Sequence, residues 1–413
     1  MTESQFILNS LLLFIGGILV MWMAAGFCML EAGLVRTKNV STMCLKNIGI
    51  FAIACIVYFI VGYHLMYGGE TGGFIGSLRW WMPDDQAALA ETPDFEAGYA
   101  SGADWFFQVV FVATATSIVS GTVAERSKLF PFFIFSAILS AIIYPIQGSW
   151  TWGGGWLSEM GFSDFAGSTI VHSVGGWAAL TGALIIGART EKYAGGRVNA
   201  LPGSNLPLAT LGTFILWFGW FGFNGASQLA LGTAADAVAV ASVLGNTNVA
   251  ACGGVVAAII LTKILYKKVD LTMALNGALA GLVSITAGPD TPTLGQATLI
   301  GAVGGVLVVF AVPLLDKLRI DDVVGAIPVH LVCGIWGTLV VPFTNADASF
   351  VTQLIGIVAV GVFVSITSAI VWLVLKFTLG VRLSQEDEAR GSDVAELGLE
   401  AYPEFGRGSR QGA

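Results

Sequence analysis

The chain has 413 residues, of which 55% are hydrophobic and only 11% are charged, and its formal net charge is −8. An ordinary soluble domain carries about 25% charged residues, so this chain has too little polar material to cover a water-exposed surface. The composition argues against a soluble enzyme and, apart from about the last thirty residues, against disorder. It predicts a polytopic membrane protein.

Eleven stretches are long and apolar enough to cross a bilayer, which takes about 20 residues. They cover residues 6–30, 44–67, 104–123, 130–148, 166–188, 207–226, 237–262, 271–288, 294–315, 324–343 and 350–376. The first stretch is too long for a cleaved signal peptide, and the start MTESQ carries no base. We therefore predict an all-α integral membrane protein with 11 transmembrane helices.

Positive charges alternate between the two sets of connections. All but one of the 19 Lys and Arg residues, from Arg36, Lys38 and Lys46 to Arg407 and Arg410, share a side with the C-terminal tail. Because Lys and Arg are enriched on the cytoplasmic side, we expect an external N-terminus and a cytoplasmic tail at 381–413. The short loops suit a bacterial inner (plasma) membrane. The opposite face is acidic and would concentrate cations, although polar loops often carry acids in any case.

The five cysteines lie in or beside apolar stretches and form no CxxC pair. We interpret them as small buried hydrophobic residues rather than a disulfide framework or a metal site. No metal and no cofactor is expected. The charge is shared between loops and tail, so no nucleic-acid partner is expected either.

Two of the three histidines lie in a repeated pattern, Asp-x-x-Gly-x-x-x-Val-His-x-Val-x-Gly, at residues 164–176 and 322–334. The first copy begins at the outer end of the fifth stretch and the second at the inner end of the tenth, so the copies run in opposite directions. This predicts a 5+5 inverted-topology repeat, a common transporter design. Its halves cover about 6–188 and 207–343, and the last span, 350–376, lies outside the repeat.

The repeat brings His172 and His330 to comparable depths near the middle of the membrane, at the interface between the halves. Ionisable residues there are functional candidates, and the alternative is hydrogen bonding between helices without a role in transport. Neutral imidazole both donates and accepts hydrogen bonds, so the pair suits a small hydrogen-bonding solute or a proton relay better than a bare metal ion. His64, near the outer end of the second span, is interpreted as an interfacial residue.

Three segments rich in aromatic residues and glycine, 106–128, 150–167 and 217–227, reach toward the outer face. Aromatic residues commonly form a belt at the headgroup level. Ring faces also attract an ammonium-like cation, most strongly when water is excluded. A nearby hydroxyl such as that of Ser227 would accept a hydrogen bond from the cation.

At these motifs the sequence resembles the ammonium transporter (Amt/Mep/Rh) family, and the resemblance covers nearly the whole chain. The matching segments are MLEAGLVRTKN (29–39), the FQ-to-AER segment (107–126), WGGGWL followed by DFAGSTIVH (152–172), GWFGFNGAS (219–227) and VHLVCGIWGT (329–338). Their order is that of the family. A tryptophan and a serine at the outer site look more like the Amt/Mep branch than the Rh branch.

The resemblance implies an outer cation site made of Trp152, Phe111 and Ser227. It also implies that Asp164 stabilises this recruiting site without coordinating the ion. Without the resemblance, Asp164 would be interpreted as the N-cap of a helix that starts at Phe165, and Ser227 as a turn residue that ends the sixth span.

Below that site, the resemblance implies a gate of two stacked rings, Phe111 and Phe223. His172 and His330 match the twin pore histidines, and Trp220 matches another pore-lining aromatic residue. On composition alone, the two phenylalanines would be ordinary packing residues.

The family is trimeric, with one pore per subunit, so the resemblance implies a homotrimer. It also implies that the transport domain, 1–380, is followed by a tail that packs beneath the trimer, near which a PII-type signalling protein docks in many bacteria. The tail departs from the family pattern at Leu397 and Leu399. Composition alone predicts a solvated polar tail.

The expected function is transmembrane transport of ammonium or ammonia, with recruitment at the outer site, deprotonation, and passage along the histidines. The alternative is an ammonium sensor that transports little and signals through its tail, although no kinase or cyclase domain follows the last span. A neutral-solute channel of the aquaporin kind lacks its paired NPA motifs here. No enzymatic motif is found, and no enzyme is expected.

Overall fold

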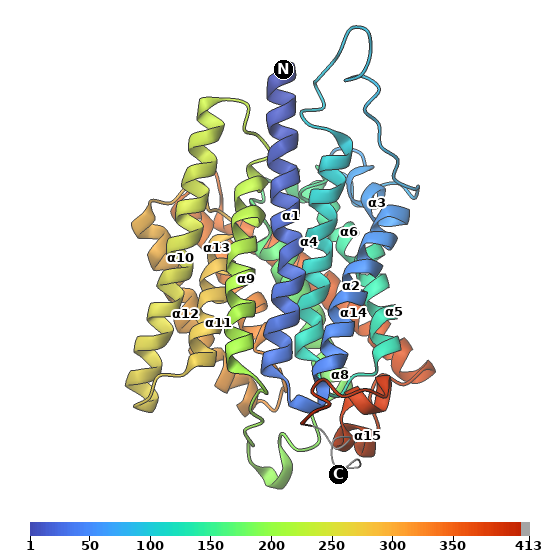
Figure 1. Ribbon diagram of the computed structural model, residues 1–413. Helices are drawn as coiled ribbons and strands as arrows, with labels where there is room; N and C mark the ends of the chain where they lie inside the picture. Colours follow the sequence, from blue (N-terminus) through green and yellow to red (C-terminus); the bar gives the residue numbers. More distant parts are fainter. Residues whose placement is uncertain (406–413) are drawn as a thin grey trace.

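The computed structural model describes residues 1–405 and is built from helices that run roughly parallel to one another (Figure 1). Among the described residues, 9 helices are long and apolar enough to cross a membrane, and two shorter apolar helices at Leu271–Ile285 and Ile327–Phe343 bring the spans to the predicted number. Each predicted stretch overlaps one of these helices. Arg407 and Arg410, counted above among the tail-side charges, lie outside the described residues.

Some of the spans consist of more than one helical element. In chain order the elements are α1 (Glu3–Leu34), α2 (Val40–Val57), η2 (Tyr58–Gly62), α3 (Tyr63–Tyr67), α4 (Ser101–Thr122), α5 (Leu129–Ile138), η3 (Leu139–Ile143), α6 (Tyr144–Ser149), η4 (Ser168–Ser173), α8 (Val174–Ile186), α9 (Leu206–Gly225), α10 (Ala234–Tyr266), α11 (Leu271–Ile285), α12 (Leu294–Lys317), η7 (Ile327–Val332), α13 (Cys333–Val340) and α14 (Phe350–Thr378). The short elements α7 (Trp156–Glu159), α15 (Gln385–Arg390) and η9 (Asp393–Leu397) lie outside the spans.

Several helices extend beyond their apolar stretch because a capping residue, rather than hydropathy, sets the end. α1 begins after Thr2 and α10 begins after Thr233, and each threonine forms a capping box with the third helical residue. Such a box satisfies two backbone N–H groups that the helix would otherwise leave without partners. Hydropathy therefore locates the membrane-embedded part of the helix, and polar caps locate its termini.

The two halves of the fold meet through equivalent elements. α1 of the first half packs along α9 of the second, and η4 with α8 packs against η7 with α13. The α1–α9 contact brings the backbones together, because a Cβ atom on Gly212 would lie 2.3 Å from the backbone nitrogen of Leu30. Small residues at such contacts let membrane helices approach closely.

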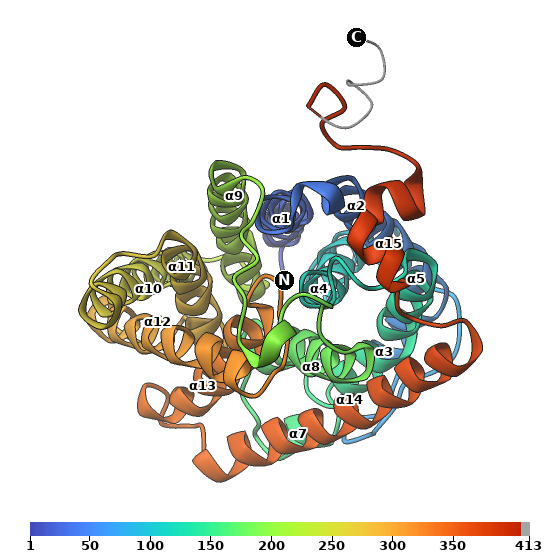
Figure 2. The ribbon, with the colours of Figure 1, turned by 90° about the horizontal axis from the view of Figure 1, so that it is seen from below.

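The last span and the tail cover the outside and one end of this assembly. Seen from below, α14 runs diagonally along the outer edge beside α8, and α15 lies under the region of α2, α4 and α5 (Figure 2). The tail is bonded to its own subunit: both carboxylate oxygens of Asp393 accept hydrogen bonds at the start of α2, from the backbone N–H groups of Ser41 and Thr42 at 2.9 and 2.7 Å. The described part of the tail therefore docks on the subunit, unlike the solvated tail that composition alone suggests.

A buried charge network joins the loops at the tail end. Arg189 donates two hydrogen bonds of 2.9 Å to the Asp321 carboxylate, and it lies 3.3 Å from Glu125. Burial would raise the pKa of Asp321, but the bonds from Arg189 and the charge of Arg126 hold that pKa well below its ordinary value. The network ties together connections that are far apart in sequence.

Two expectations about single residues are wrong. Lys46 was counted with the connections, but it lies within α2 and is 1% exposed. The five cysteines are free, as expected, but Cys252 on α10 is exposed rather than buried. In a membrane-spanning helix, an exposed cysteine faces an apolar surrounding as well, so sequence pattern cannot separate the two locations.

Candidate functional site

Each copy of the repeat folds into the same local structure. A glycine with positive φ, Gly167 at 109° and Gly325 at 83°, is followed by a short π-helix, η4 or η7, that carries the histidine. Only glycine adopts this backbone conformation without strain. A π-helical turn is wider than an α-helical turn and is often found at functional sites. The repeat in sequence is thus also a repeat in conformation.

Asp164 organises the start of η4 with both of its carboxylate oxygens. They accept hydrogen bonds of 2.8 to 3.0 Å from four successive backbone N–H groups, those of Gly167, Ser168, Thr169 and Ile170. In the second copy, Asp322 occupies the equivalent position and accepts one such hydrogen bond, of 2.7 Å, from the backbone N–H of Ile327 at the start of η7. Burial raises the pKa of Asp164 to about 6 against the opposing effect of these donors.

The helix after Asp164 does not start at Phe165, as expected. The backbone N–H groups of Phe165 and Ala166 donate to Ala287 and Thr286, and the helical turns begin at Ser168. The capping function predicted for the aspartate is therefore present, but across a bend. Consequently, the eight residues from Asp164 to the histidine do not form a straight helical rise.

His172 and His330 are buried side by side in the interior. Their rings are stacked with centroids 5.2 Å apart and an interplanar angle of 24°, and their Nδ1 atoms lie 3.2 Å apart. The buried Nε2 of His172 has no hydrogen-bond partner in the described part of the chain. It therefore remains available to a polar solute.

Aromatic rings lead to this pair from the side of the fold on which the N-terminus of the chain lies. The Phe111 ring on α4 lies 6.0 Å from Trp152 and 4.1 Å from Phe223 on α9. Phe223 in turn stacks on His172 at 5.2 Å, and Trp220 stacks on the same imidazole at 4.9 Å. The five rings form one contiguous group, and the two phenylalanines close it with an interplanar angle of 34°.

Polar groups flank the outer rings. The Trp152 Nε1 donates to the backbone oxygen of Asp164 at 2.9 Å, which fixes the indole beside the start of η4. Ser227, in the short helix η6 (Ala226–Gln228), donates its hydroxyl hydrogen to the Phe223 carbonyl at 2.7 Å. Because the hydrogen is used there, the hydroxyl oxygen can accept a hydrogen bond from a cation. The structure thus brings together all eight residues predicted for the site.

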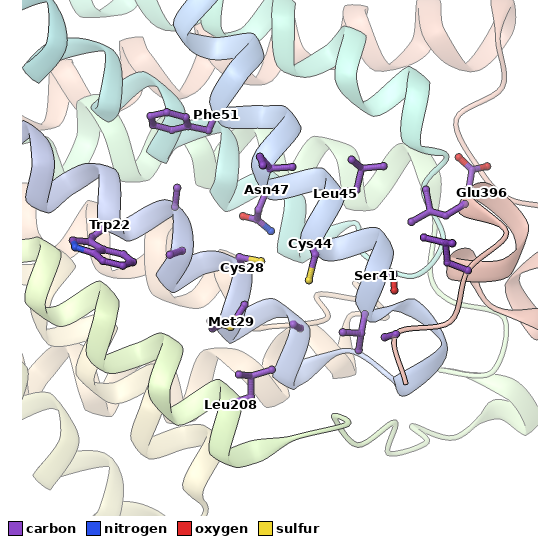
Figure 3. A pocket seen from close by; sticks show the side chains of 18 of the residues that line it. Trp22, Cys28, Met29, Ser41, Cys44, Leu45, Asn47, Phe51, Leu208 and Glu396 are labelled. Carbon is purple, nitrogen blue, oxygen red and sulfur yellow. The ribbon is translucent and has the colours of Figure 1, made fainter. Parts of the chain in front are cut away.

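The cavities around the site differ greatly in size and character. One of them, of about 1180 Å³, is an apolar pocket between α1, α2 and the tail, lined by Trp22, Cys28 and Cys44 among others (Figure 3). It lies away from the histidines and borders exposed apolar side chains such as Ile18 and Ile48. We therefore do not assign it to the aromatic and histidine site.

Known proteins of one family are similar to this chain over nearly its whole length. The model of the Ammonium Transporter Family matches residues 11–402. The chain belongs to this family. Among its relatives, ammonium transporter Amt2 of Archaeoglobus fulgidus is 40% identical over 94% of this chain and 87% of its own length. A putative ammonium transporter of Synechocystis is also 40% identical, over 96% of this chain and 89% of its own length.

Solved structures of this transporter family have the same fold. One, described as a sensor Amt protein, superposes with a TM-score of 0.88 at 36% identity and covers 96% of this chain and 100% of its own. Mep2 of Candida albicans superposes with a TM-score of 0.81 at 26% identity, over 97% of this chain and 91% of its own. The predicted fold class is confirmed.

Sequence reasoning missed other buried polar residues of this family member. Thr286 accepts a hydrogen bond of 2.9 Å from the Trp220 indole and so orients it. Glu31 and Lys46, both fully inside the fold, were not considered as site residues. Both could have been recognised from the sequence, because an ionisable residue within an apolar stretch is unusual. No cluster of metal-binding side chains is found in the described residues.

Proposed function

We propose that this protein transports ammonium or ammonia across a membrane. The observation that carries the proposal is the contiguous group of rings that leads from Trp152 through Phe111 and Phe223 to the His172–His330 pair. The names of the relatives, ammonium transporters from archaea and cyanobacteria, support the same substrate.

In this proposal, ammonium is recruited at the outer end of the group. The faces of Trp152 and Phe111 attract the cation, and the Ser227 oxygen accepts one of its hydrogen bonds. The Asp164 carboxylate, held by four backbone N–H groups next to Trp152, adds a negative charge that favours the cation without contacting it. Ammonium then loses a proton, because a bare cation is costly deeper in an apolar interior.

Ammonia next passes between Phe111 and Phe223, whose contact must open briefly. It meets the free Nε2 of His172 and moves along the imidazole pair and Trp220. Neutral imidazoles offer ammonia both a donor and an acceptor, while the surrounding apolar rings offer water and larger ions little.

We also propose the topology and assembly that the sequence suggests. The N-terminus lies outside and the tail is cytoplasmic, in a bacterial inner membrane, with a transport domain at 1–380 and a tail at 381–413. The subunits form a homotrimer, and a PII-type protein docks at the tail end. The bonds of Asp393 to the start of α2 support a coupling of the tail to the spans. Affinity capture on the immobilised protein, with and without nucleotides, tests the PII partner.

The test of transport is ammonium uptake into lipid vesicles that contain the purified protein. We expect saturable uptake above that of protein-free vesicles, and a strong decrease for His172→Ala. If folded protein binds ammonium but moves none, the sensor alternative replaces transport.

A further inference from the structure

Two buried charged residues lie on the tail side of the histidine pair, and the route proposed above does not use them. Glu31 on α1 and Lys46 on α2 are each 1% exposed. Charged groups inside a membrane are costly and usually carry a task. Neutral side chains could hydrogen-bond the helices equally well, so hydrogen bonding alone does not explain why these two residues are ionisable. Their contacts indicate what the charges do.

The two charges meet at one residue of α4, Ser120. The Ser120 hydroxyl donates to Glu31 Oε2 at 2.9 Å, and the Ser120 carbonyl accepts from the Lys46 Nζ at 3.1 Å. Asn47 on α2, which is labelled in Figure 3, donates a second bond of 2.8 Å to the same Oε2. Lys46 also lies 4.0 Å above the Phe132 ring. Ser120 and Asn47 thus both donate to Glu31 Oε2 and hold this carboxylate oxygen in place.

The other carboxylate oxygen, Oε1, lies on the side of Gly121, where a Cβ atom would be 3.1 Å from Oε1 and 2.5 Å from Val324. Val324 and Glu31 line a small cavity of about 10 Å³, and His330 lines the same cavity. That volume is close to the minimum for a single water molecule, and ammonia is of similar size. Glu31 and His330 are the two ionisable side chains in this lining.

The small cavity leads toward the tail end. Asn276, Val324 and Gly325 line it and also line a second, polar cavity of about 360 Å³, whose wall includes Arg189 and Asp316. The small cavity, which His330 and Glu31 both line, thus shares part of its wall with the polar cavity. On the proposed route, a carboxyl group lies beside the solute where it leaves the apolar part of the pore.

We propose that Glu31 exchanges protons with the pore on the tail side of His330, and that Lys46 positions and balances its charge through Ser120. This inference rests on the proposed transport function. The proton that ammonium loses at the outer site passes to the neutral histidine pair, and the pair gives it to the Glu31 carboxylate. The Glu31 O–H bond then breaks as an N–H bond forms to ammonia. Ammonium leaves through the polar cavity, and the carboxylate and neutral histidines are restored. One ammonium ion enters and one leaves.

The test compares ammonium-triggered current and ammonium accumulation in vesicles that contain the full chain. We expect Glu31→Gln, which keeps the shape of the side chain, to lower the current at least about tenfold, as general acid–base groups commonly do. Glu31→Asp should retain part of the current. The double variant Glu31→Gln with Lys46→Met should be as impaired as Glu31→Gln alone, because the loss comes from the missing proton carrier.

Two results with the Glu31 variants would overturn the proposal. One is a current in Glu31→Gln equal to that of the unchanged protein. The other is full recovery in the double variant, since the carboxylate would then serve only to balance Lys46. Wild-type accumulation without current would also overturn it, because the relay moves charge. If the unchanged protein accumulates no ammonium, the proposed transport function itself fails. Vesicles with the unchanged protein alone show this, so it is not confused with failure of the Glu31 proposal. Size-exclusion profiles identify variants that fail to fold, and Glu31→Asp then carries the comparison.

Discussion

The Nδ1 atoms of His172 and His330 lie 3.2 Å apart, although 158 residues separate the two side chains in sequence. At this distance one nitrogen must carry a proton and the other must offer its lone pair. The two rings therefore hold complementary tautomers, and a change in one ring alters what the other presents. Because η4 and η7 come from opposite halves, the contact also joins the halves at the centre of the fold.

Removal of the His172 ring should impair conduction. In His172→Ala, His330 loses its Nδ1 partner and Phe223 loses the ring on which it stacks. We expect ammonium-driven flux to fall by about tenfold or more, equivalent to at least about 1.4 kcal/mol in the barrier. The measurement is initial uptake into vesicles at equal protein content.

The third histidine provides the matched control. His64 is half-buried near the start of α3, where its ring meets Tyr63 edge-on, outside the ring group described above. His64→Ala should leave flux within about twofold of the unchanged protein. Unaltered uptake and selectivity in His172→Ala would contradict a role of the pair in conduction.

Ammonium affinity should depend on pH through Asp164. Burial raises the pKa of this carboxyl to about 6, so its charged form predominates above that pH and its neutral form below it. The negative charge beside the outer site should therefore be lost as pH falls from about 7 to about 5, weakening ammonium binding by roughly fivefold to tenfold, or about 1–1.4 kcal/mol. Isothermal titration at several pH values measures this change.

Asp164→Asn removes the titrating group and should give a weak affinity that is constant over the same pH range. Asp347, exposed near the N-terminal face, is a matched control, and Asp347→Asn should retain the pH dependence. If Asp164→Asn shows the same pH profile as the unchanged protein, another group is responsible.

The Arg189–Asp321 pair should stabilise the tail end of the fold. Asp321 is 1% exposed, and its removal leaves a buried guanidinium with Glu125 as its remaining acidic partner. Loss of one partner of a buried pair typically costs about 3–5 kcal/mol, and Glu125 should keep the loss near the lower value. Thermal unfolding of Asp321→Asn in detergent measures the effect, and equal melting temperatures would contradict it.

The sign of its pH dependence follows from the depressed pKa of Asp321. The unfolded carboxyl titrates near about 3.9, so the stabilisation is complete above that pH and is lost as pH falls toward the lower folded value. The difference in unfolding free energy between the two proteins should therefore be constant from about pH 5 to pH 8 and shrink only in stronger acid.

The tail should loosen when Asp393 is replaced. Its carboxylate bonds to the N–H groups of Ser41 and Thr42 and to the Thr42 hydroxyl at 2.8 Å. Loss of a cap of this kind typically costs about 0.5–2 kcal/mol, so Asp393→Ala should speed hydrogen exchange in residues 392–399 several-fold. Glu404→Ala, at an exposed tail position, should not. Unchanged exchange in Asp393→Ala would show that other contacts hold the tail.

The sequence was sufficient to predict the spans and the fold class, because hydropathy and the alternation of positive charges act over whole helices. The histidine repeat could also be recognised from the sequence, because its matching residues have the same spacing in both copies. The aromatic residues were found through the family resemblance. Composition alone left Phe111 and Phe223 as packing residues, since neither hydropathy nor periodicity tells which apolar side chains face one another across helices.

What the sequence did not reveal depends on backbone geometry and distant contacts. The π-helical turns at the histidines and the bend after Asp164 arise where Gly167 takes a positive φ and where Phe165 bonds to another span. The burial of Glu31 and Lys46 follows from the packing of α1, α2 and α4. A lysine at the predicted end of a span looks like a loop residue until that packing is known.

The central claim is that ammonium or ammonia crosses the membrane along the rings and histidines. The most direct measurement is an ammonium jump on protein-containing vesicles, with current and lumenal pH recorded for the unchanged chain and for Asp164→Ala. We predict a saturable response of the unchanged chain that is strongly reduced in Asp164→Ala. Folded protein that binds ammonium but gives neither current nor a pH change above empty vesicles would contradict the claim.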